Sequence, residues 1–266
     1  MFLVNSLESI FLDMTMLGSP LFWIMLFSVV VSSSVSSSAG FGFGILLVAI
    51  LQFFMEPVEL VGVITILGCV GSFLRVIETR KIGLWKRSLY FIIPGLFGVP
   101  LGVALLKYLA PLLMKRYLNL VLLASVLLLY YNLKNPFTIR FINPSKRKLS
   151  APLIGFISGI LGGSSTLSGP PIVIWGMLQG WNKMDMHATW ARFFFSIALF
   201  SLFTLAFNGL YKDSTIVLSL YLIPAIFLGF KIGTWIRDKL PEERFRHYVL
   251  SFLFLSGLLG LALSFR

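Results

Sequence analysis

The stretch Gly162-Gly163-Ser164-Ser165-Thr166-Leu167-Ser168-Gly169-Pro170-Pro171-Ile172-Val173 interrupts an apolar segment in the second half of the chain. Its residues are small, carry hydroxyl groups or cannot continue a regular helix. Glycine adopts backbone angles that other residues avoid, and proline has no backbone N–H to donate. Within a lipid bilayer, irregular backbone is tolerated only where protein buries it or where it lines a wet cavity. The stretch therefore predicts a broken helix beside a cavity in a membrane protein.

The composition of the whole chain supports the same class. Of the 266 residues, 58% are hydrophobic and 12% are charged, and the mean hydropathy is +0.93. A soluble domain of this length cannot bury so much apolar surface, so we expect an all-α polytopic membrane protein. The net charge of +12 comes from short basic clusters between apolar runs. Such clusters are typical of cytoplasmic loops and do not indicate nucleic-acid binding.

A second break is expected near the start of the chain, where a serine run leads into Gly40-Phe41-Gly42-Phe43-Gly44. The apolar arm beyond Gly44 is too short to span a bilayer, which takes about 20 helical residues. We therefore expect two helical hairpins, at about 20–55 and 151–179. Full spans are expected at about 58–77, 89–106 and 112–133 in the first half and at about 186–210, 215–236 and 245–264 in the second. A basic loop at 134–149 separates the halves, 1–133 and 150–266.

Local matches between the halves indicate a duplication. Pro94, Gly98 and Gly102 recur in order as Pro224, Gly229 and Gly233, and Gln52 recurs as Gln179. The spacing of the recurring glycines also predicts faces that allow close packing of helices. The chain is therefore predicted to contain two repeats, each with a broken hairpin followed by three transmembrane helices.

The distribution of basic residues decides between two orientations of the repeats. If each broken segment crosses the membrane once, the halves are parallel, and the two sides receive 11 and 8 basic residues. If each broken segment is re-entrant, the halves are inverted, and the counts become 14 and 5. The second alternative fits the positive-inside rule better. It predicts both termini outside the cytoplasmic membrane and the two breaks meeting near the midplane.

Three basic residues, Arg75, Arg192 and Lys231, lie within the expected spans, whereas the acidic residues fall in tails, in loops or near span ends. A buried cation without a carboxylate partner is costly and is a functional candidate by default. An anionic substrate would supply the missing charge. Arg192 is the strongest candidate because it lies several residues inside its span. For Arg75 and Lys231 two alternatives stay open, namely a functional role and snorkelling to the membrane surface, with Glu78 as a further partner for Arg75.

The breaks themselves are suited to an anion, because the N-terminus of a half-helix carries free N–H groups and a positive dipole. Close helix packing is the alternative explanation of their small residues. The predicted substrate contacts are Ser38, Gly40, Gly42, Gly44, Gly163, Ser164, Ser165, Thr166, Ser168, Gly169, Pro170 and Arg192.

Catalytic groups are scarce in the sequence. The two histidines, His187 and His247, lie far apart, and no pair of carboxylates falls within a span. We therefore expect neither a metal site nor a cofactor. His187 and Thr189 are candidates for proton coupling or for contact with the substrate.

Two motifs carry a resemblance to a known family. Ser38-Ala39-Gly40-Phe41-Gly42-Phe43-Gly44-Ile45-Leu46-Leu47 resembles the first glycine-rich motif of the TauE/SafE sulfite exporters, also called the 4-toluene sulfonate uptake permease family. Gly159-Ile160-Leu161-Gly162-Gly163 together with Ser168-Gly169-Pro170-Pro171-Ile172-Val173 resembles the second. Where many members have Arg-Ala-Thr, this chain has His187-Ala188-Thr189. The resemblance implies transport of sulfite, organosulfonates or related sulfur-containing or carboxylate anions across a cytoplasmic membrane.

The leading hypothesis is a secondary transporter in which one repeat rocks against the other, with the substrate bound between the breaks. The alternatives are an intramembrane enzyme that acts on a lipid-linked substrate and a passive anion channel. The sequence leaves the exact anion, the direction of transport, the coupling ion and the oligomeric state open.

Overall fold

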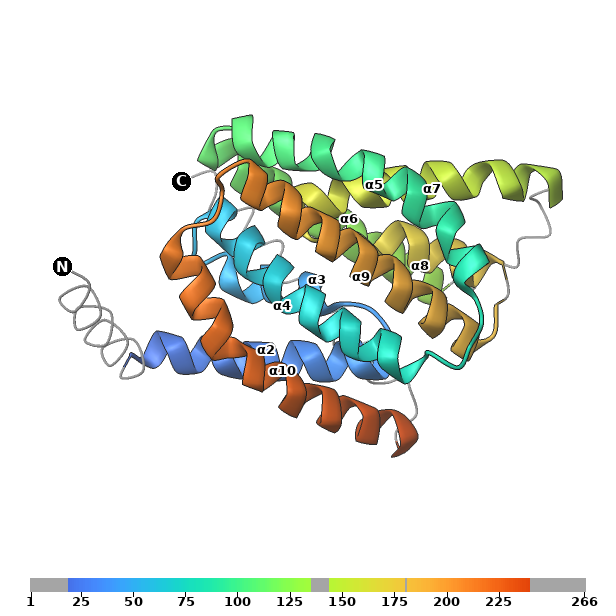
Figure 1. Ribbon diagram of the computed structural model, residues 1–266, viewed down its shortest axis with the longest axis horizontal. Coiled ribbons are helices and arrows are strands. Elements are labelled where there is room, and N and C mark those ends of the chain that lie inside the picture. Colours follow the sequence, from blue (N-terminus) through green and yellow to red (C-terminus); the bar gives the residue numbers. More distant parts are fainter. Residues whose placement is uncertain (1–18, 135–143, 180, 240–266) are drawn as a thin grey trace.

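A computed structural model describes residues 19–134, 144–179 and 181–239, and nearly all of these residues are helical (Figure 1). The helices in this part of the chain are α2 (Pro20–Ala39), α3 (Phe43–Leu51), α4 (Pro57–Glu78), α5 (Trp85–Tyr108), α6 (Pro111–Lys134), α7 (Pro144–Ser165), α8 (Gly169–Leu178), α9 (Lys183–Phe207) and α10 (Asp213–Lys239). The expected span at 245–264 and both chain termini lie outside the described residues.

Six of the helices, α2, α4, α5, α6, α9 and α10, are long and apolar enough to cross a membrane. The apolar part of α7 is shorter, and α3 and α8 have only 9 and 10 residues. Short helices of this kind cannot span the hydrocarbon core alone. The prediction of an all-α polytopic membrane protein is confirmed.

The first break is narrower than the sequence indicates. The serines at 32–38 continue α2, and the interruption is confined to Gly40, Phe41 and Gly42. The serines remain within α2. The hydroxyl groups of Ser34, Ser37 and Ser38 donate to carbonyl oxygens of the preceding turn, as Ser34 does to Val30 at 2.8 Å, a bond that serine commonly forms in a helix. Gly40 and Gly42 have φ angles of 85° and 101°, which only glycine adopts readily.

The second break lies between α7 and α8 and is also narrower than expected. Ser164 and Ser165 form the last turn of α7, so the irregular backbone comprises Thr166, Leu167 and Ser168. Thr166 has a φ of 61°, a left-handed conformation that is strained for a β-branched residue. The basic connection is shorter as well, because residues from Pro144 onward already belong to α7.

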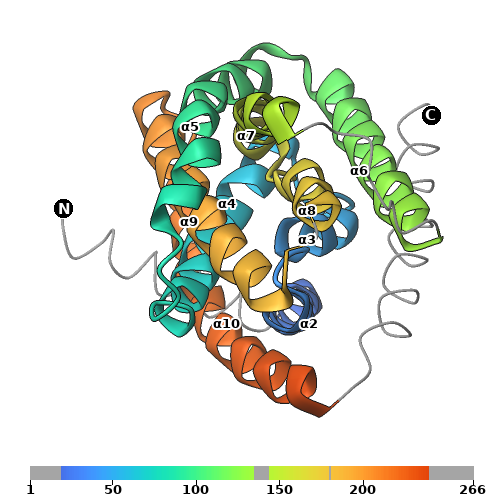
Figure 2. The ribbon, with the colours of Figure 1, turned by 90° about the vertical axis from the view of Figure 1, so that its right-hand side faces the viewer.

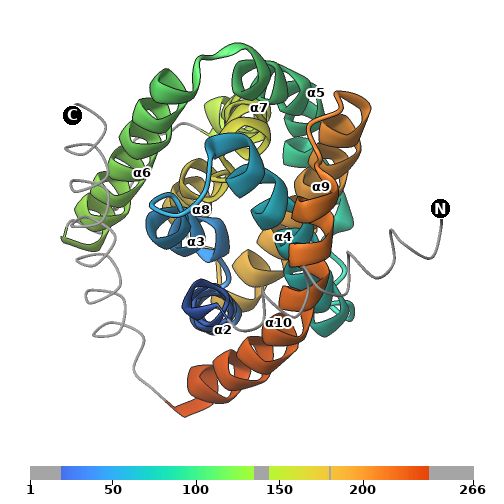
Figure 3. The ribbon, with the colours of Figure 1, turned by 90° about the vertical axis from the view of Figure 1, so that its left-hand side faces the viewer.

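Helices of the two halves pack in exchanged pairs. The most extensive contacts are those of α5 with α7 and of α10 with α2, followed by those of α4 with α9. If α2, α4 and α5 correspond to α7, α9 and α10, each pair joins one half of the chain to the other. In the end-on views the short helices α3 and α8 lie inside the longer ones (Figures 2 and 3).

Glycines allow the two largest pairs to approach closely. A Cβ atom on Gly98 of α5 would lie 2.8 Å from the backbone N of Ile160 in α7. On α10, a Cβ atom on Gly233 would lie 2.8 Å from the Cβ of Ser37 in α2. Real Cβ atoms do not approach other atoms this closely, so both interfaces depend on the missing side chain.

Substituting Gly98 by alanine tests the α5–α7 interface. Alanine is favoured over glycine inside a helix by about 1 kcal/mol, so a helix without close neighbours would gain stability. Overpacking, in contrast, costs about 1–3 kcal/mol, and the contact with Ile160 is with backbone that cannot move aside. We expect Gly98→Ala to lower the midpoint of thermal unfolding of the purified protein in detergent.

The matched control is Gly83→Ala, because a Cβ atom on Gly83 meets nothing within 4 Å. The control is expected to change stability by no more than about 0.5 kcal/mol. An unchanged or raised unfolding midpoint in Gly98→Ala would contradict the close packing.

Candidate functional site

The two breaks are in direct contact inside the molecule. Gly44, at the start of α3, faces Thr166 of the second break, and a Cβ atom on Gly44 would lie 2.6 Å from the Thr166 carbonyl oxygen. Only glycine permits this approach. The interrupted backbone of the first half therefore lies against the interrupted backbone of the second.

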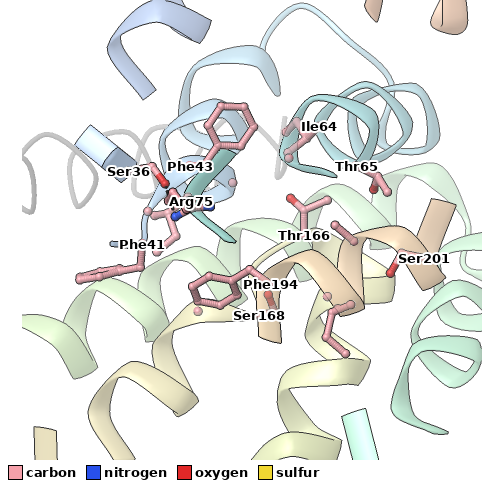
Figure 4. Close-up of a pocket in the computed structure, with 18 residues that line it drawn as sticks. Ser36, Phe41, Phe43, Ile64, Thr65, Arg75, Thr166, Ser168, Phe194 and Ser201 are labelled. Carbon is pink, nitrogen blue, oxygen red and sulfur yellow. Dashed lines mark hydrogen bonds between the residues drawn. The ribbon is translucent and has the colours of Figure 1, made fainter. Parts of the chain in front are cut away.

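A cavity of about 70 Å³ lies beside this contact, between the breaks and the helices α4 and α9 (Figure 4). In the part of the chain that the structure describes, its lining is neutral except for one arginine. The lining residues are Ser36, Phe41, Gly42, Phe43, Gly44, Ile45, Ile64, Thr65, Gly68, Arg75, Gly162, Thr166, Ser168, Gly169, Phe194, Ile197, Ala198 and Ser201.

Arg75 is the charged residue of the cavity, and its side chain is buried. Its Nη1 donates to the hydroxyl of Ser36 at 2.7 Å and to the carbonyl oxygen of Gly40 at 3.0 Å. Its guanidinium also lies 5.9 Å from the centre of the Phe194 ring. Figure 4 shows Arg75 beside Ser36, with Thr65 and Ser201 farther away past Thr166.

The position of Arg75 decides between snorkelling, pairing with Glu78 and a role in the cavity. The side chain is directed into the protein, which excludes snorkelling. Glu78 forms its ion pair with Arg237, at 2.6 Å, and not with Arg75. Among the described residues Arg75 has no ion pair, so its charge is met only by neutral oxygen atoms and an aromatic ring. Lys231, in contrast, is exposed on the outside of α10 and does not line the cavity.

The helix ends at the cavity differ in the donors they offer. In α3 the hydrogen-bond ladder begins with the N–H of Leu46 donating to Gly42, so the N–H groups of residues 43–45 precede it. These three residues line the cavity. In α8, Pro170 and Pro171 have no N–H, which leaves Gly169 as the donor of the first turn. The first break therefore contributes backbone donors, and the second contributes mainly the hydroxyl of Ser168.

The predicted contacts divide into two groups. Gly42, Gly44, Thr166, Ser168 and Gly169 line the cavity, and Gly40 adjoins it through the carbonyl oxygen bound by Arg75.

The other predicted contacts near the two breaks do not line the cavity. The hydroxyls of Ser38, Ser164 and Ser165 donate to carbonyl oxygens of their own helices. Gly163 packs against Val99 and Val103 of α5, and Pro170 does not line the cavity. For these residues the packing alternative describes what the structure shows.

Arg192 lies away from the cavity. It is fully buried, and its guanidinium donates to the carbonyl oxygens of Ala188, Thr79 and Ile82. The same group stacks 5.1 Å from the centre of the Trp85 ring. Arg192 thus binds the connection between α4 and α5, and the cation that lines this cavity is Arg75.

The two coupling candidates occupy different places. The ring of His187 lies against Gly40, because a Cβ atom on Gly40 would be 3.0 Å from His187 Cε1. His187 therefore contacts the first break but does not line the cavity. Thr189 is fully buried but does not line the cavity.

The cavity lining includes residues that were not among the predicted contacts, among them the hydroxyl residues Thr65 and Ser201 and the aromatic residue Phe194. Thr65 and Ser201 are isolated hydroxyl residues within apolar spans, which is a weak signal because serine and threonine are common in membrane helices. Ile64, Gly68 and Arg75 follow one another at helical spacing on one face of α4. That spacing is the signal that could have linked Arg75 to the cavity.

These features define a polytopic helical membrane protein with a small cavity at the contact of two helix breaks. Within this class, the chain belongs to the sulfite exporter TauE/SafE family, because the model of that family matches residues 24–259. The resemblance carried by the glycine-rich motifs is thereby confirmed. No curated protein and no solved structure matches the chain.

A structural role for Arg192 makes a prediction that separates it from Arg75. In Arg192→Met, a side chain of similar length fills the space but leaves the carbonyl oxygens of Thr79 and Ile82 without their donor. An unsatisfied buried acceptor costs about 1–3 kcal/mol. We expect a lower midpoint of thermal unfolding, measured in detergent.

Anion binding by Arg192→Met, measured below its unfolding temperature, is expected to equal that of the unchanged protein. Loss of anion binding in a folded Arg192→Met protein would indicate that Arg192, and not Arg75, is the cation that binds the anion.

Proposed function

We propose that this protein is a secondary transporter that carries a small anion across the cytoplasmic membrane, with the cavity between the two breaks as its binding site. The family description, sulfite exporter, supports this class of function. Sulfite, a small organosulfonate or a related sulfur-containing or carboxylate anion is the proposed substrate.

The observation that carries the proposal is the position of Arg75. It is buried in a cavity that no acidic residue lines, among the part of the chain that the structure describes. Placing a cation inside a membrane protein is costly unless an opposite charge or a wet cavity accompanies it. A bound anion supplies that charge, and the N-terminus of α3 adds free N–H groups and a favourable dipole.

The size of the cavity restricts the substrate. Sites for drug-sized ligands have volumes of roughly 300–1,000 Å³, whereas this cavity has about 70 Å³. An anion with a few non-hydrogen atoms fits this space better than a lipid-linked molecule. Among the described residues the lining contains no carboxylate, imidazole or thiol, and together with the family description this favours transport over catalysis.

We infer that the two halves are inverted repeats. The exchanged pairs α5–α7 and α10–α2 support a twofold relation between the halves. In Figure 1, α4 and α9 run in opposite directions, as do α5 and α10. Inverted repeats with broken helices at the centre are typical of secondary transporters that work by alternating access.

The charge distribution supports an orientation for this arrangement. The α4–α5 connection carries Arg80 and Lys81, and Arg87 nearby pairs with Asp185 at 3.0 Å. By the positive-inside rule the end of the molecule with the α4–α5 connection faces the cytoplasm. We place both chain termini on the opposite side of the membrane.

Substitution of Arg75 tests the proposed site. A ligand that binds only the folded state raises the free energy of unfolding, by about 2.7 kcal/mol at a concentration 100 times its Kd. We expect a selective, saturable rise in the thermal unfolding midpoint with one small anion from a panel of sulfite, sulfate, thiosulfate, taurine, sulfoacetate, acetate and chloride. In Arg75→Gln this rise should disappear.

Lys231→Gln is the matched control, because it removes the same charge from a helix but at an exposed position outside the cavity. It should respond to the anion like the unchanged protein. An equal response in Arg75→Gln would show that Arg75 does not bind the anion. No response to any anion in the unchanged protein would overturn the proposed substrate class.

A transport measurement separates the carrier from a passive channel. In proteoliposomes, alternating access predicts saturable uptake of the labelled anion that unlabelled anion on the opposite side accelerates. Uptake without saturation and without this acceleration would instead support the channel.

A further inference from the structure

Three buried hydroxyl groups extend the polar lining beyond the cavity. Ser201 Oγ, Tyr211 Oη and Thr215 Oγ1 have no hydrogen-bond partner among the described residues. Ser201 and Thr215 are each only 1% exposed. A hydroxyl buried without a partner costs about 1–3 kcal/mol, so three of them in one region require an explanation.

The three hydroxyl residues lie along one continuous seam. Ser201 lines the cavity together with Thr65. Gly62 is three residues before Thr65 and therefore on the same side of α4. A Cβ atom on Gly62 would lie 3.1 Å from Thr215 Cγ2 and 3.2 Å from Tyr211 Cε1. Gly62, Thr65, Ser201, Tyr211 and Thr215 thus form a hydroxyl seam between α4, α9 and α10.

The seam leads from the cavity toward one end of the molecule. Tyr211 belongs to the connection between α9 and α10, and Thr215 is in the first turn of α10. Figure 1 shows this connection beside the start of α4, at the end opposite the α4–α5 connection. Both buried arginines are near that opposite end. Arg75 lies in the last turn of α4, and Arg192 binds the carbonyl oxygens of Thr79 and Ile82 in the α4–α5 connection.

Neighbouring hydroxyls show that the lack of partners is not imposed by the helices. Thr65 donates to the carbonyl oxygen of Val61 at 2.7 Å, and Ser219 donates to that of Thr215 at 2.6 Å. Serine and threonine in a helix commonly satisfy themselves in this way. The hydroxyl of Ser201 does not use this bond. Thr215 lies in the first turn of α10, so the carbonyl oxygen four residues earlier precedes the helix. Both hydroxyls are therefore available to water or another partner.

We propose that the hydroxyl seam is the path by which water and the anion pass between the cavity and the membrane side on which the α9–α10 connection lies. At membrane depth, polar groups without a protein partner are tolerated where they line a water-filled cavity, and the seam, unlike the hydroxyl of Ser158, is continuous with the cavity. Hydroxyl groups donate to an anion without adding a fixed charge that would hold it. The nature of the passing solute rests on the proposed function, whereas access of water to the seam does not.

Thiol labelling tests the path. The lone cysteine is first removed by Cys69→Ser, and Ser201→Cys and Thr215→Cys are made in that background. A membrane-impermeant, negatively charged thiosulfonate reagent is added to intact cells, without sulfite, which would consume the reagent. Because the reagent needs a hydrated thiolate, we expect both cysteines to react at least about tenfold faster than a buried control.

The matched control is Ser158→Cys in the same background. Ser158 is also fully buried and its hydroxyl also lacks a partner, but it belongs to α7 and is not part of the seam. Equal labelling rates at Ser201→Cys, Thr215→Cys and Ser158→Cys would overturn the path. So would labelling of the seam only from the side of the α4–α5 connection.

Tyr211→Phe provides a second measurement that does not depend on labelling. It keeps the ring against Gly62 and removes only the hydroxyl group. We expect a severalfold lower rate of anion exchange in proteoliposomes and an unchanged anion affinity. An unchanged exchange rate would count against the path. Rapid labelling of the seam in a protein that binds no anion would instead leave the water path in place and overturn the proposed function.

Discussion

The first break depends on the donation of hydrogen bonds by Arg75 to the interrupted end of α2. A helix that ends within a membrane leaves carbonyl oxygens without partners, and lipid cannot supply donors. Arg75 satisfies the carbonyl oxygen of Gly40 and the hydroxyl of Ser36 with one nitrogen atom. Arg192 does the same for Thr79 and Ile82 at the end of α4. Both buried arginines therefore act on backbone that has left its helix, but Arg75 also borders the cavity between the breaks, whereas Arg192 does not.

This double use of arginine explains which parts of the site could be predicted from the sequence. Hydropathy and helix-breaking residues locate the spans and both breaks, because these depend on local composition. The choice between Arg75 and Arg192 depends on which neighbour each helix face meets, and a distance from the span end does not contain that information. The serines of α2 were likewise expected to interrupt a helix, whereas α2 continues through them to Ala39, with the hydroxyls of Ser34 and Ser37 bound to carbonyl oxygens of the preceding turn.

The two breaks are alike in position but not in chemistry. The first break has glycines at positive φ and is followed by α3, whose first turn has free N–H groups. The second break has Thr166 at positive φ and is followed by α8, whose first turn contains two prolines. The two breaks thus provide one helix end that is rich in hydrogen-bond donors and one that is nearly without them. The proposed anion site is therefore formed mainly by the first half, through Arg75 and the start of α3.

For the proposed alternating access, the close-packed helix pairs determine which parts can move as units. Gly98 and its neighbours bind α5 to α7, and Gly229 and Gly233 bind α10 to α2. Each pair joins one half of the chain to the other, so the two halves cannot rock against each other without breaking both glycine interfaces. A motion that preserves these interfaces moves the pair α2–α10 against the pair α5–α7, with α4 and α9 between them. The contact of Gly44 with Thr166 lies at the centre of that motion, where both helices are already interrupted and small backbone rotations cost least.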